Sequence, residues 1–251
     1  MEKIELKSGI IYGPVNSRRL GSSLGINLSP AIKICSFDCV YCERGRTPQK
    51  LASLPFDLCG LPEPDEVGRA LEVKLSSRAN YDYITFSGNG EPTLHPQFET
   101  IVRIVKQLRN KFAPRSKLAI LSNASTLRRD DVQRALGELD LPIMKLDAGD
   151  EETFQKMNRP HPSIRFGDLI GNLKKTKGIT IQTMFIDGEI ENSSDDEVRS
   201  WIARIKEIQP EGVQIYSLSR PAKKTLTPVS KIKLEEIAAQ LREEGIQAKA
   251  Y

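Results

Sequence analysis

The stretch CSFDCVYC, residues Cys35–Cys42, decides how this sequence is interpreted. Its three cysteines are separated by three residues and then by two, so a short looping segment can bring three thiolates together without distant residues. A [4Fe–4S] cluster normally takes four cysteine thiolates. Three thiolates would therefore leave one iron of such a cluster open to another ligand.

Other uses of these cysteines are a disulfide or a zinc site. A disulfide would leave one of the three cysteines over. A structural zinc ion takes four ligands, and the chain has one further cysteine, Cys59, while His95 and His161 lie far along the sequence. Zinc bound by the three clustered cysteines and Cys59 stays open as an alternative, and otherwise Cys59 is a spare thiol. The spacing favours the iron–sulfur cluster.

A second motif follows the hydrophobic run YITF, residues 83–86, and reads SGNGEP over residues 87–92. Gly88 and Gly90 allow backbone angles that other residues avoid, and they allow a close approach to a ligand. Glu91 supplies a carboxylate that can accept a charge-assisted hydrogen bond from an ammonium group. By itself the motif is typical of a surface turn; after a strand and downstream of the cysteines, it favours ligand binding.

The two motifs, in this order, resemble the signature of the radical SAM superfamily. The resemblance implies that Cys35, Cys39 and Cys42 hold a [4Fe–4S] cluster, whose open iron binds the amino and carboxylate groups of S-adenosylmethionine. It also implies that the backbone of Tyr41 lies against the adenine. The segment from Gly88 through Gly90 to Glu91 would hold the amino group of the methionine.

The resemblance further implies an oxidoreductase-type reaction. The reduced cluster passes one electron to S-adenosylmethionine, which yields methionine and a 5′-deoxyadenosyl radical that abstracts hydrogen from a substrate. An electron donor such as flavodoxin or ferredoxin would be a partner. The substrate and the residues that act on it are not identified by this resemblance.

Residues 12–21, 87–92 and 145–149 resemble, more narrowly, a subgroup of short radical SAM proteins associated with the tRNA wyosine-base synthases. This likeness makes RNA a candidate substrate and tRNA modification a candidate role. Those synthases carry a second iron–sulfur cluster held by extra cysteines, and only Cys59 is left over here. Formation of the wyosine base is therefore not transferred to this chain.

Strand-like and helix-like segments alternate along the chain, which predicts parallel strands with helical crossovers. Together with the resemblance, this pattern predicts an α/β fold, a partial (β/α)6 TIM-like barrel. Residues 24–251 would form one domain, with residues 1–23 as an N-terminal extension. Ser194 and Glu197 predict a capping box at a helix start. The six predicted strands cover residues 24–28, 81–87, 118–122, 143–147, 179–186 and 213–218.

Polar residues on or after these strands are candidate ligand contacts, since active residues of such barrels lie at the carboxyl ends of strands. Ser122 and Asn123 match positions where the family contacts S-adenosylmethionine, although an ordinary turn explains them equally well. Lys145 and Asp147 share one face of their strand, and if buried they need a ligand or each other as a partner. The residues predicted to bind a cofactor, beyond those of the two motifs, are Ser122, Asn123, Lys145, Asp147, Gln182 and Gln214.

Composition fits an enzyme of the reducing cytoplasm. The chain has 251 residues, 37 basic and 33 acidic side chains and a net charge of +4, a balance that neither requires nor excludes nucleic acid. No apolar stretch approaches the ~20 residues of a membrane span. An iron–sulfur electron-transfer protein and a zinc-stabilised RNA-binding module remain as alternative functions. Basic residues that could contact RNA are Arg44, Arg46, Lys50, Lys174, Lys175, Lys177, Lys223 and Lys224.

Overall fold

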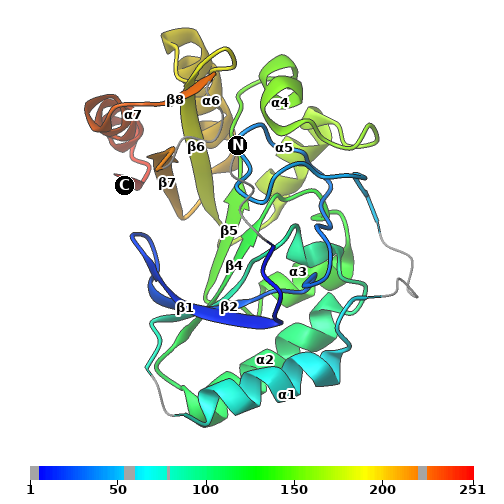
Figure 1. The fold of residues 1–251 in the computed structure, drawn as a ribbon. Coiled ribbons are helices and arrows are strands. Elements are labelled where there is room, and N and C mark those ends of the chain that lie inside the picture. The colour runs from blue at the N-terminus through cyan, green and yellow to red at the C-terminus, as the bar shows by residue number, and fades with distance from the viewer. Residues whose placement is uncertain (1–5, 54–59, 78–79, 220–224) are drawn as a thin grey trace. The chain divides into compact units, whose positions relative to one another are not determined.

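The computed structural model describes residues 6–53, 60–77, 80–219 and 225–251 (Figure 1). The chain divides into two compact units. The amino-terminal unit comprises Glu5–Ser36 and Thr47–Pro142, and the carboxy-terminal unit comprises Phe37–Arg46 and Ile143–Tyr251 together with the first residues. The predictions for Cys59, Lys223 and Lys224 lie outside the described residues.

The amino-terminal unit is built on a four-stranded sheet in the order β1-β2-β3-β4. Strand β1 pairs antiparallel with β2, and β2, β3 and β4 are parallel, with Leu24, Ile84 and Leu118 in register. The strands are β1 (Ile11–Ser17), β2 (Gly21–Ile26), β3 (Tyr83–Phe86) and β4 (Lys117–Ser122), and the helices are α1 (Pro64–Leu75), the short η1 (Pro92–Leu94), α2 (Phe98–Phe112) and α3 (Asp130–Leu136).

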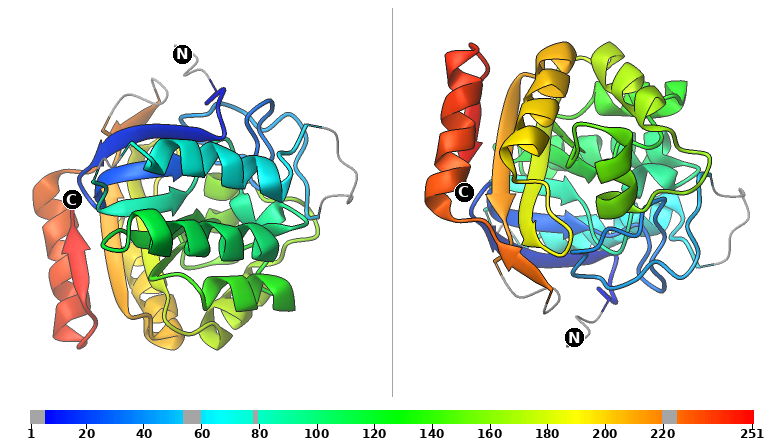
Figure 2. Two further views of the ribbon diagram at one scale, coloured as in Figure 1. Left: turned by 90° about the horizontal axis from the view of Figure 1, so that it is seen from below. Right: turned by 90° about the horizontal axis from the view of Figure 1, so that it is seen from above.

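Helices α1, α2 and α3 lie side by side along this sheet (Figure 2). Helix α2 buries Phe98, Ile101 and Val105 at helical spacing, which explains why this segment is a helix packed on a sheet. The ring of Phe98 meets that of Phe86 from β3 edge to face, with centroids 5.5 Å apart. Apolar packing of this kind fixes where β3 ends and hence where the loop after it begins.

The carboxy-terminal unit contains parallel strands in the order β5-β6-β7-β9, with β8 antiparallel to β6. Trp201 of α6 is buried and donates its indole N–H to the carbonyl oxygen of Leu146 at 3.0 Å, which ties the helix to the end of β5. The elements are β5 (Leu141–Lys145), α4 (Glu151–Asn158), α5 (Phe166–Lys175), β6 (Thr180–Gly188), α6 (Asp195–Ile208), β7 (Gly212–Ser217), β8 (Leu226–Pro228), α7 (Lys231–Glu243) and β9 (Ala248–Ala250).

All six predicted strands are present, as β2 to β7, and each is followed by at least one helix in the chain. The stretch treated as an extension supplies β1, which hydrogen-bonds to β2. The short strands β8 and β9 were not predicted. No helix within the described ranges combines the length and apolar character that a membrane crossing requires.

The predicted capping box at the start of α6 is wrong. Ser194 is the N-cap residue, but its side chain makes no capping hydrogen bond. The carboxylate of Glu197 accepts instead from the hydroxyl of Thr153 at 2.8 Å, and Glu191 accepts from the backbone N–H of Ser194 at 2.8 Å. A tertiary partner, Thr153, therefore binds the carboxylate of Glu197, and the nearby Glu191 binds the backbone N–H that Glu197 would have bound in a capping box.

Candidate functional site

The three clustered cysteines lie in a loop between β2 and α1. None of them forms a disulfide in the part of the chain that the structure describes, and each is partly exposed. Two successive turns shape the loop: the N–H of Cys42 donates to the carbonyl of Cys39, and the N–H of Gly45 donates to that of Cys42, both at 3.0 Å. Cys35 belongs to the amino-terminal unit, and Cys39 and Cys42 belong to the carboxy-terminal unit.

Among the described residues, no three His, Cys, Asp or Glu side chains converge on one metal ion. In an iron–sulfur cube each thiolate binds a different iron. The donor set of three cysteines in a short loop, none of them in a disulfide, fits such a cluster.

The loop after β3 is joined by its backbone to the residue before Cys35. The N–H of Glu91 donates to the carbonyl of Ile34 at 2.8 Å, and the N–H of Ile34 donates to the carbonyl of Asn89 at 3.1 Å. Gly90 has φ +154°, and a Cβ there would lie 1.7 Å from the carbonyl oxygen of Ile34. The glycine is required because two backbones meet at this point.

Gly88 also has positive φ, at +141°, and a Cβ there would lie 2.5 Å from the side-chain oxygen of Asn27. The expectation that both glycines of the motif adopt unusual backbone angles is confirmed. The close neighbours that the structure shows are protein atoms, and the approach of a ligand to Gly88 and Gly90 stays a prediction.

Glu91 is buried, and its carboxylate organises the loop after β4. Oε1 accepts from the N–H of Thr93 (3.1 Å), the hydroxyl of Thr93 (2.6 Å) and the hydroxyl of Ser122 (2.8 Å), and Oε2 accepts from the N–H of Asn123 (2.5 Å). Burial raises the pKa of Glu91, and these four donors lower it without restoring its ordinary value. Contact of Glu91 with a ligand ammonium stays a prediction.

Asn123 reaches from the end of β4 to the cysteine loop within the amino-terminal unit. Its Nδ2 donates to Sγ of Cys35 at 3.6 Å and to Oγ of Ser36 at 2.8 Å. Its Oδ1 accepts from the N–H of Ser125 at 3.0 Å, which forms a turn around Ala124. The amide is thus held by Oγ of Ser36 and by the N–H of Ser125 while it touches a cysteine sulfur.

Asp147 is the centre of a hydrogen-bond network in the carboxy-terminal unit, as Glu91 is in the amino-terminal unit. The side chain of Asp147 is fully buried. Its carboxylate accepts from the hydroxyl of Tyr41, from Nδ2 of Asn158 at 2.7 Å and from the N–H of Met184 at 2.9 Å. Nζ of Lys145 lies 3.4 Å from the carboxylate and 5.1 Å from the centre of the Tyr41 ring. Asp147 therefore connects the cysteine loop to β5, α4 and β6.

The charge of Asp147 sets the protonation of its neighbours Lys145 and Tyr41. Burial alone would lower the pKa of Lys145, but the nearby carboxylate of Asp147 and its other neighbours hold that pKa above its ordinary range. Burial, reinforced by Asp147, raises the pKa of Tyr41 well above its ordinary value. The prediction that a buried Lys145 and Asp147 could satisfy each other is confirmed, and their contact with a ligand stays a prediction.

Asn158 was not among the predicted site residues. Its Nδ2 donates to Sγ of Cys39 at 3.4 Å as well as to Asp147. The carbonyls of Asn158 and Arg159 both accept from the N–H of Asp38, at 3.0 and 3.3 Å. Burial raises the pKa of the Cys39 thiol to about 11. The signal in the sequence was an asparagine at a helix end before Arg-Pro, which by itself indicates only the end of a helix.

Gln182 and Gln214 lie in register on β6 and β7, and Nε2 of Gln182 donates to Oε1 of Gln214 at 3.0 Å. Lys145 is in register with Gln182, so the three residues form a polar row across β5, β6 and β7. This row was not predicted from the sequence, and contact of its residues with a cofactor stays a prediction.

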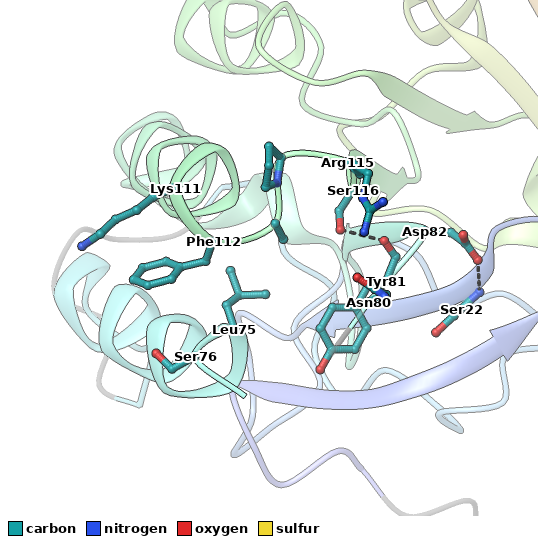
Figure 3. Close-up of a pocket in the computed structure, with 12 residues that line it drawn as sticks. Ser22, Leu75, Ser76, Asn80, Tyr81, Asp82, Lys111, Phe112, Arg115 and Ser116 are labelled. Atoms are coloured by element: carbon teal, nitrogen blue, oxygen red, sulfur yellow. Dashed lines mark hydrogen bonds between the residues drawn. The ribbon is translucent and has the colours of Figure 1, made fainter. Parts of the chain in front are cut away.

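A hollow of about 920 Å³ lies at the other end of the amino-terminal sheet (Figure 3). Its lining includes Asp82, which precedes β3 and accepts from the N–H of Ser22 at 2.8 Å, and Ser116, which precedes β4. Glu91 and Asn123 follow the same two strands. The hollow is therefore separate from the candidate site, because it lies at the amino ends of the strands.

Comparison with known proteins gives a family. A model of the radical SAM superfamily matches residues 29–211. The protein named GTPase Obg from Brachyspira hyodysenteriae is 33% identical over 222 residues, which cover 87% of this chain and 31% of that protein. A UPF0026 protein from Methanocaldococcus jannaschii is 33% identical over 218 residues, which cover 84% of this chain and 64% of the relative. The matched part of the chain thus spans about one third of the length of the Brachyspira protein and about two thirds of the length of the Methanocaldococcus protein.

A solved structure, TYW1 with a lysine-pyruvate adduct bound, matches with a TM-score of 0.63 at 14% sequence identity, over 88% of this chain and 73% of the other. Identity this low shows the fold alone. The predicted partial TIM-like barrel is confirmed by this likeness together with the family match.

Proposed function

Since this chain belongs to the radical SAM superfamily, it is an enzyme that uses a [4Fe–4S] cluster and S-adenosylmethionine, and we propose that it generates a 5′-deoxyadenosyl radical that abstracts hydrogen from an organic substrate. The cofactors supply the chemistry, namely one-electron reductive cleavage of a carbon–sulfur bond. The observation that supports this proposal is the set of three cysteines, none in a disulfide, of which two receive amide hydrogen bonds at sulfur.

The chain's own residues position the ligands. Cys35, Cys39 and Cys42 are proposed to hold the cluster. The backbone pairing between Ile34 and Gly90 fixes the start of the cysteine loop relative to the glycine-rich loop. Asp147 holds Tyr41, the residue whose backbone the resemblance assigns to the adenine.

The remaining candidate residues divide into three groups. Ser122 and Asn123 donate hydrogen bonds to Glu91, and Asp147 accepts one from Tyr41. We therefore assign Ser122, Asn123 and Asp147 to positioning the residues that they bind. The segment from Gly88 to Glu91 is assigned to the methionine end of S-adenosylmethionine. The polar row that contains Lys145, Gln182 and Gln214 is assigned to polar groups of the cofactor or the substrate, because it lines one face of β5 to β7.

The test is reductive cleavage by the anaerobically reconstituted protein. With dithionite and S-adenosylmethionine, we expect 5′-deoxyadenosine and methionine, measured by liquid chromatography. Cys39→Ser should abolish both iron binding and product, while Cys59→Ser, which changes the cysteine outside the cluster motif, should retain both. Wild-type protein with a full complement of iron and no 5′-deoxyadenosine would refute the proposal.

A transfer-RNA base is the substrate class to test first, because the sequence resembles the subgroup associated with wyosine-base synthases. Arg46, whose side chain is 87% exposed, follows the cysteines and could meet RNA phosphates. The exposed Lys174, Lys175 and Lys177 lie instead at the amino end of β6. We expect unmodified tRNA transcripts to stimulate 5′-deoxyadenosine formation in wild type and less so in Arg46→Ala, with Lys175→Ala as the control. No stimulation by RNA would exclude this class.

Flavodoxin or ferredoxin is the proposed physiological electron donor. Replacing dithionite by either reduced protein should support the same cleavage. If neither supports turnover while dithionite does, the donor belongs to another class.

A further inference from the structure

Each compact unit places one asparagine amide on a cysteine sulfur. In the amino-terminal unit, Asn123 donates to Cys35 at 3.6 Å, and in the carboxy-terminal unit, Asn158 donates to Cys39 at 3.4 Å. Both asparagines are buried, with exposed fractions of 7% and 1%. Buried amides need partners for their hydrogens, so contact with sulfur is a fixed part of how each side chain is satisfied.

The two amides use their hydrogens in the same way. Each NH₂ group has one oxygen partner, Ser36 Oγ at 2.8 Å for Asn123 and Asp147 Oδ2 at 2.7 Å for Asn158, and one sulfur partner. The oxygen partner fixes the orientation of the amide plane. The other N–H is then directed at the cysteine.

The backbone after each asparagine is also unusual. Ala124 has φ +66° and Arg159 has φ +45°, and these are two of the three non-glycine residues with positive φ in the described ranges. Left-handed backbone at such residues is unfavourable and concentrates at functional sites. The turn at Arg159 lets the carbonyls of Asn158 and Arg159 both meet the N–H of Asp38. At Arg159 the left-handed end of α4 holds Asn158 against the cysteine loop.

We propose that Asn123 and Asn158 are positioning residues for the cluster, which donate hydrogen bonds to the thiolates of Cys35 and Cys39 and thereby raise the reduction potential of the cluster. Hydrogen bonds to cluster sulfurs are among the factors that set this potential. A donor stabilises the more negative, reduced state more than the oxidised state. The inference rests on the cluster assignment and is independent of the substrate.

The test is a redox titration of the reconstituted protein without S-adenosylmethionine, in which the EPR signal of the reduced cluster is measured at each potential. Asn158→Ala and Asn123→Ala should each lower the midpoint potential, so that the ratio of reduced to oxidised cluster at a fixed potential falls about tenfold, or about 59 mV for one electron. Matched controls are Asn192→Ala and Asn27→Ala, which remove buried asparagines bonded to backbone groups in the same two units. Control variants should leave the potential unchanged even where they lower stability.

Fully loaded Asn123 and Asn158 variants with the wild-type potential would overturn the proposal, and so would controls that shift it equally. If the variants fail to hold iron, the proposal is tested instead with wild-type protein labelled with nitrogen-15 at its asparagine side-chain amides. Pulsed EPR of the reduced cluster should then detect coupling to these side-chain nitrogens, and its absence would refute the hydrogen bonds. Because neither readout requires turnover, a failure here is distinguishable from a failure of the radical chemistry.

Discussion

The hydroxyl of Tyr41 donates a hydrogen bond to the carboxylate of Asp147, although the two residues are separated by 106 positions in the sequence. Tyr41 lies between two of the cysteines, and Asp147 follows β5. The bond is buried and shares its acceptor with Asn158 and Met184. The shape of the cysteine loop in the carboxy-terminal unit therefore depends on a residue outside both sequence motifs.

Asp147→Asn should destabilise the protein strongly. The substitution leaves the partly buried ammonium of Lys145, whose side chain is 21% exposed, without its counter-charge, and it turns an amide NH₂ toward existing donors, at an expected cost of about 2–3 kcal/mol. Urea denaturation of the protein without its cluster would measure the loss. The control is Asp196→Asn, because Asp196 is an exposed partner of Arg199 on α6 and should contribute less than about 0.5 kcal/mol. Equal losses in the two variants would contradict the role assigned to Asp147.

Gly90→Ala should prevent the backbone pairing with Ile34, because the new methyl group would lie 1.7 Å from a carbonyl oxygen. We expect a loss of more than about 3 kcal/mol in the free energy of unfolding, a size typical of severe steric or packing defects. Gly171→Ala is the matched control. Position 171 is inside α5 with no atom within 4 Å of the added methyl group, so this change should stabilise the helix by about 0.5–1 kcal/mol. A well-folded Gly90→Ala protein would show that the pairing is dispensable.

Ala124→Gly should stabilise the protein. Ala124 has φ +66°, where a non-glycine residue costs about 1–2 kcal/mol. Part of the gain is offset by the greater flexibility of glycine in the unfolded chain and by the loss of a buried methyl group, worth about 0.8 kcal/mol. The expected net stabilisation is below about 0.5 kcal/mol, measured by thermal or urea unfolding. Ala119→Gly in β4, whose methyl group is equally buried but whose backbone is that of a strand, should have the opposite sign. Destabilisation by both changes would mean that the methyl group of Ala124 packs favourably.

His95 should make stability depend on pH. Burial lowers the pKa of His95 below its ordinary value of 6.5, and the nearby Arg129 also lowers it. The unfolded chain therefore binds this proton at a higher pH than the folded chain, so stability should decline as the pH falls below about 6.5 and through the lowered pKa of the folded state.

His95→Gln should remove this component of the pH dependence, measured as the free energy of unfolding between pH 7 and lower values. The only other histidine, His161, provides the control. It lies in a loop and contacts the hydroxyl of Ser163 at 2.9 Å, and His161→Gln shows what the same substitution does outside the buried site. An unchanged profile in His95→Gln would contradict the explanation.

Much of this architecture could be predicted from the sequence, because periodicity and motif spacing are local. The strand from Tyr83 to Phe86 and the helix that buries Ile101 and Val105 follow from residues close together in the chain. The role of Asn158 could not be predicted in this way, since its sulfur partner Cys39 is 119 positions away. Nor does a glycine motif reveal that the neighbour of Gly90 is the carbonyl of Ile34.

The capping box is a contact that the sequence predicted and that the protein does not make. The spacing of Ser194 and Glu197 is locally favourable, but Thr153 from α4 binds the glutamate instead. A side-chain partner from another element outweighed a local preference, which no window of neighbouring sequence would show.

The separation of polar groups between the two ends of the strands has a practical use. Lys174 and Lys175 are exposed in the last turn of α5, just before β6 begins. Asp147 lies after the carboxyl end of β5, and the polar row lies within the strands. A dye or electrode linker confined to this turn would sit at the amino end of β6, away from Asp147 and the polar row. Surface-bound protein could then be studied by voltammetry with little interference from the attachment itself.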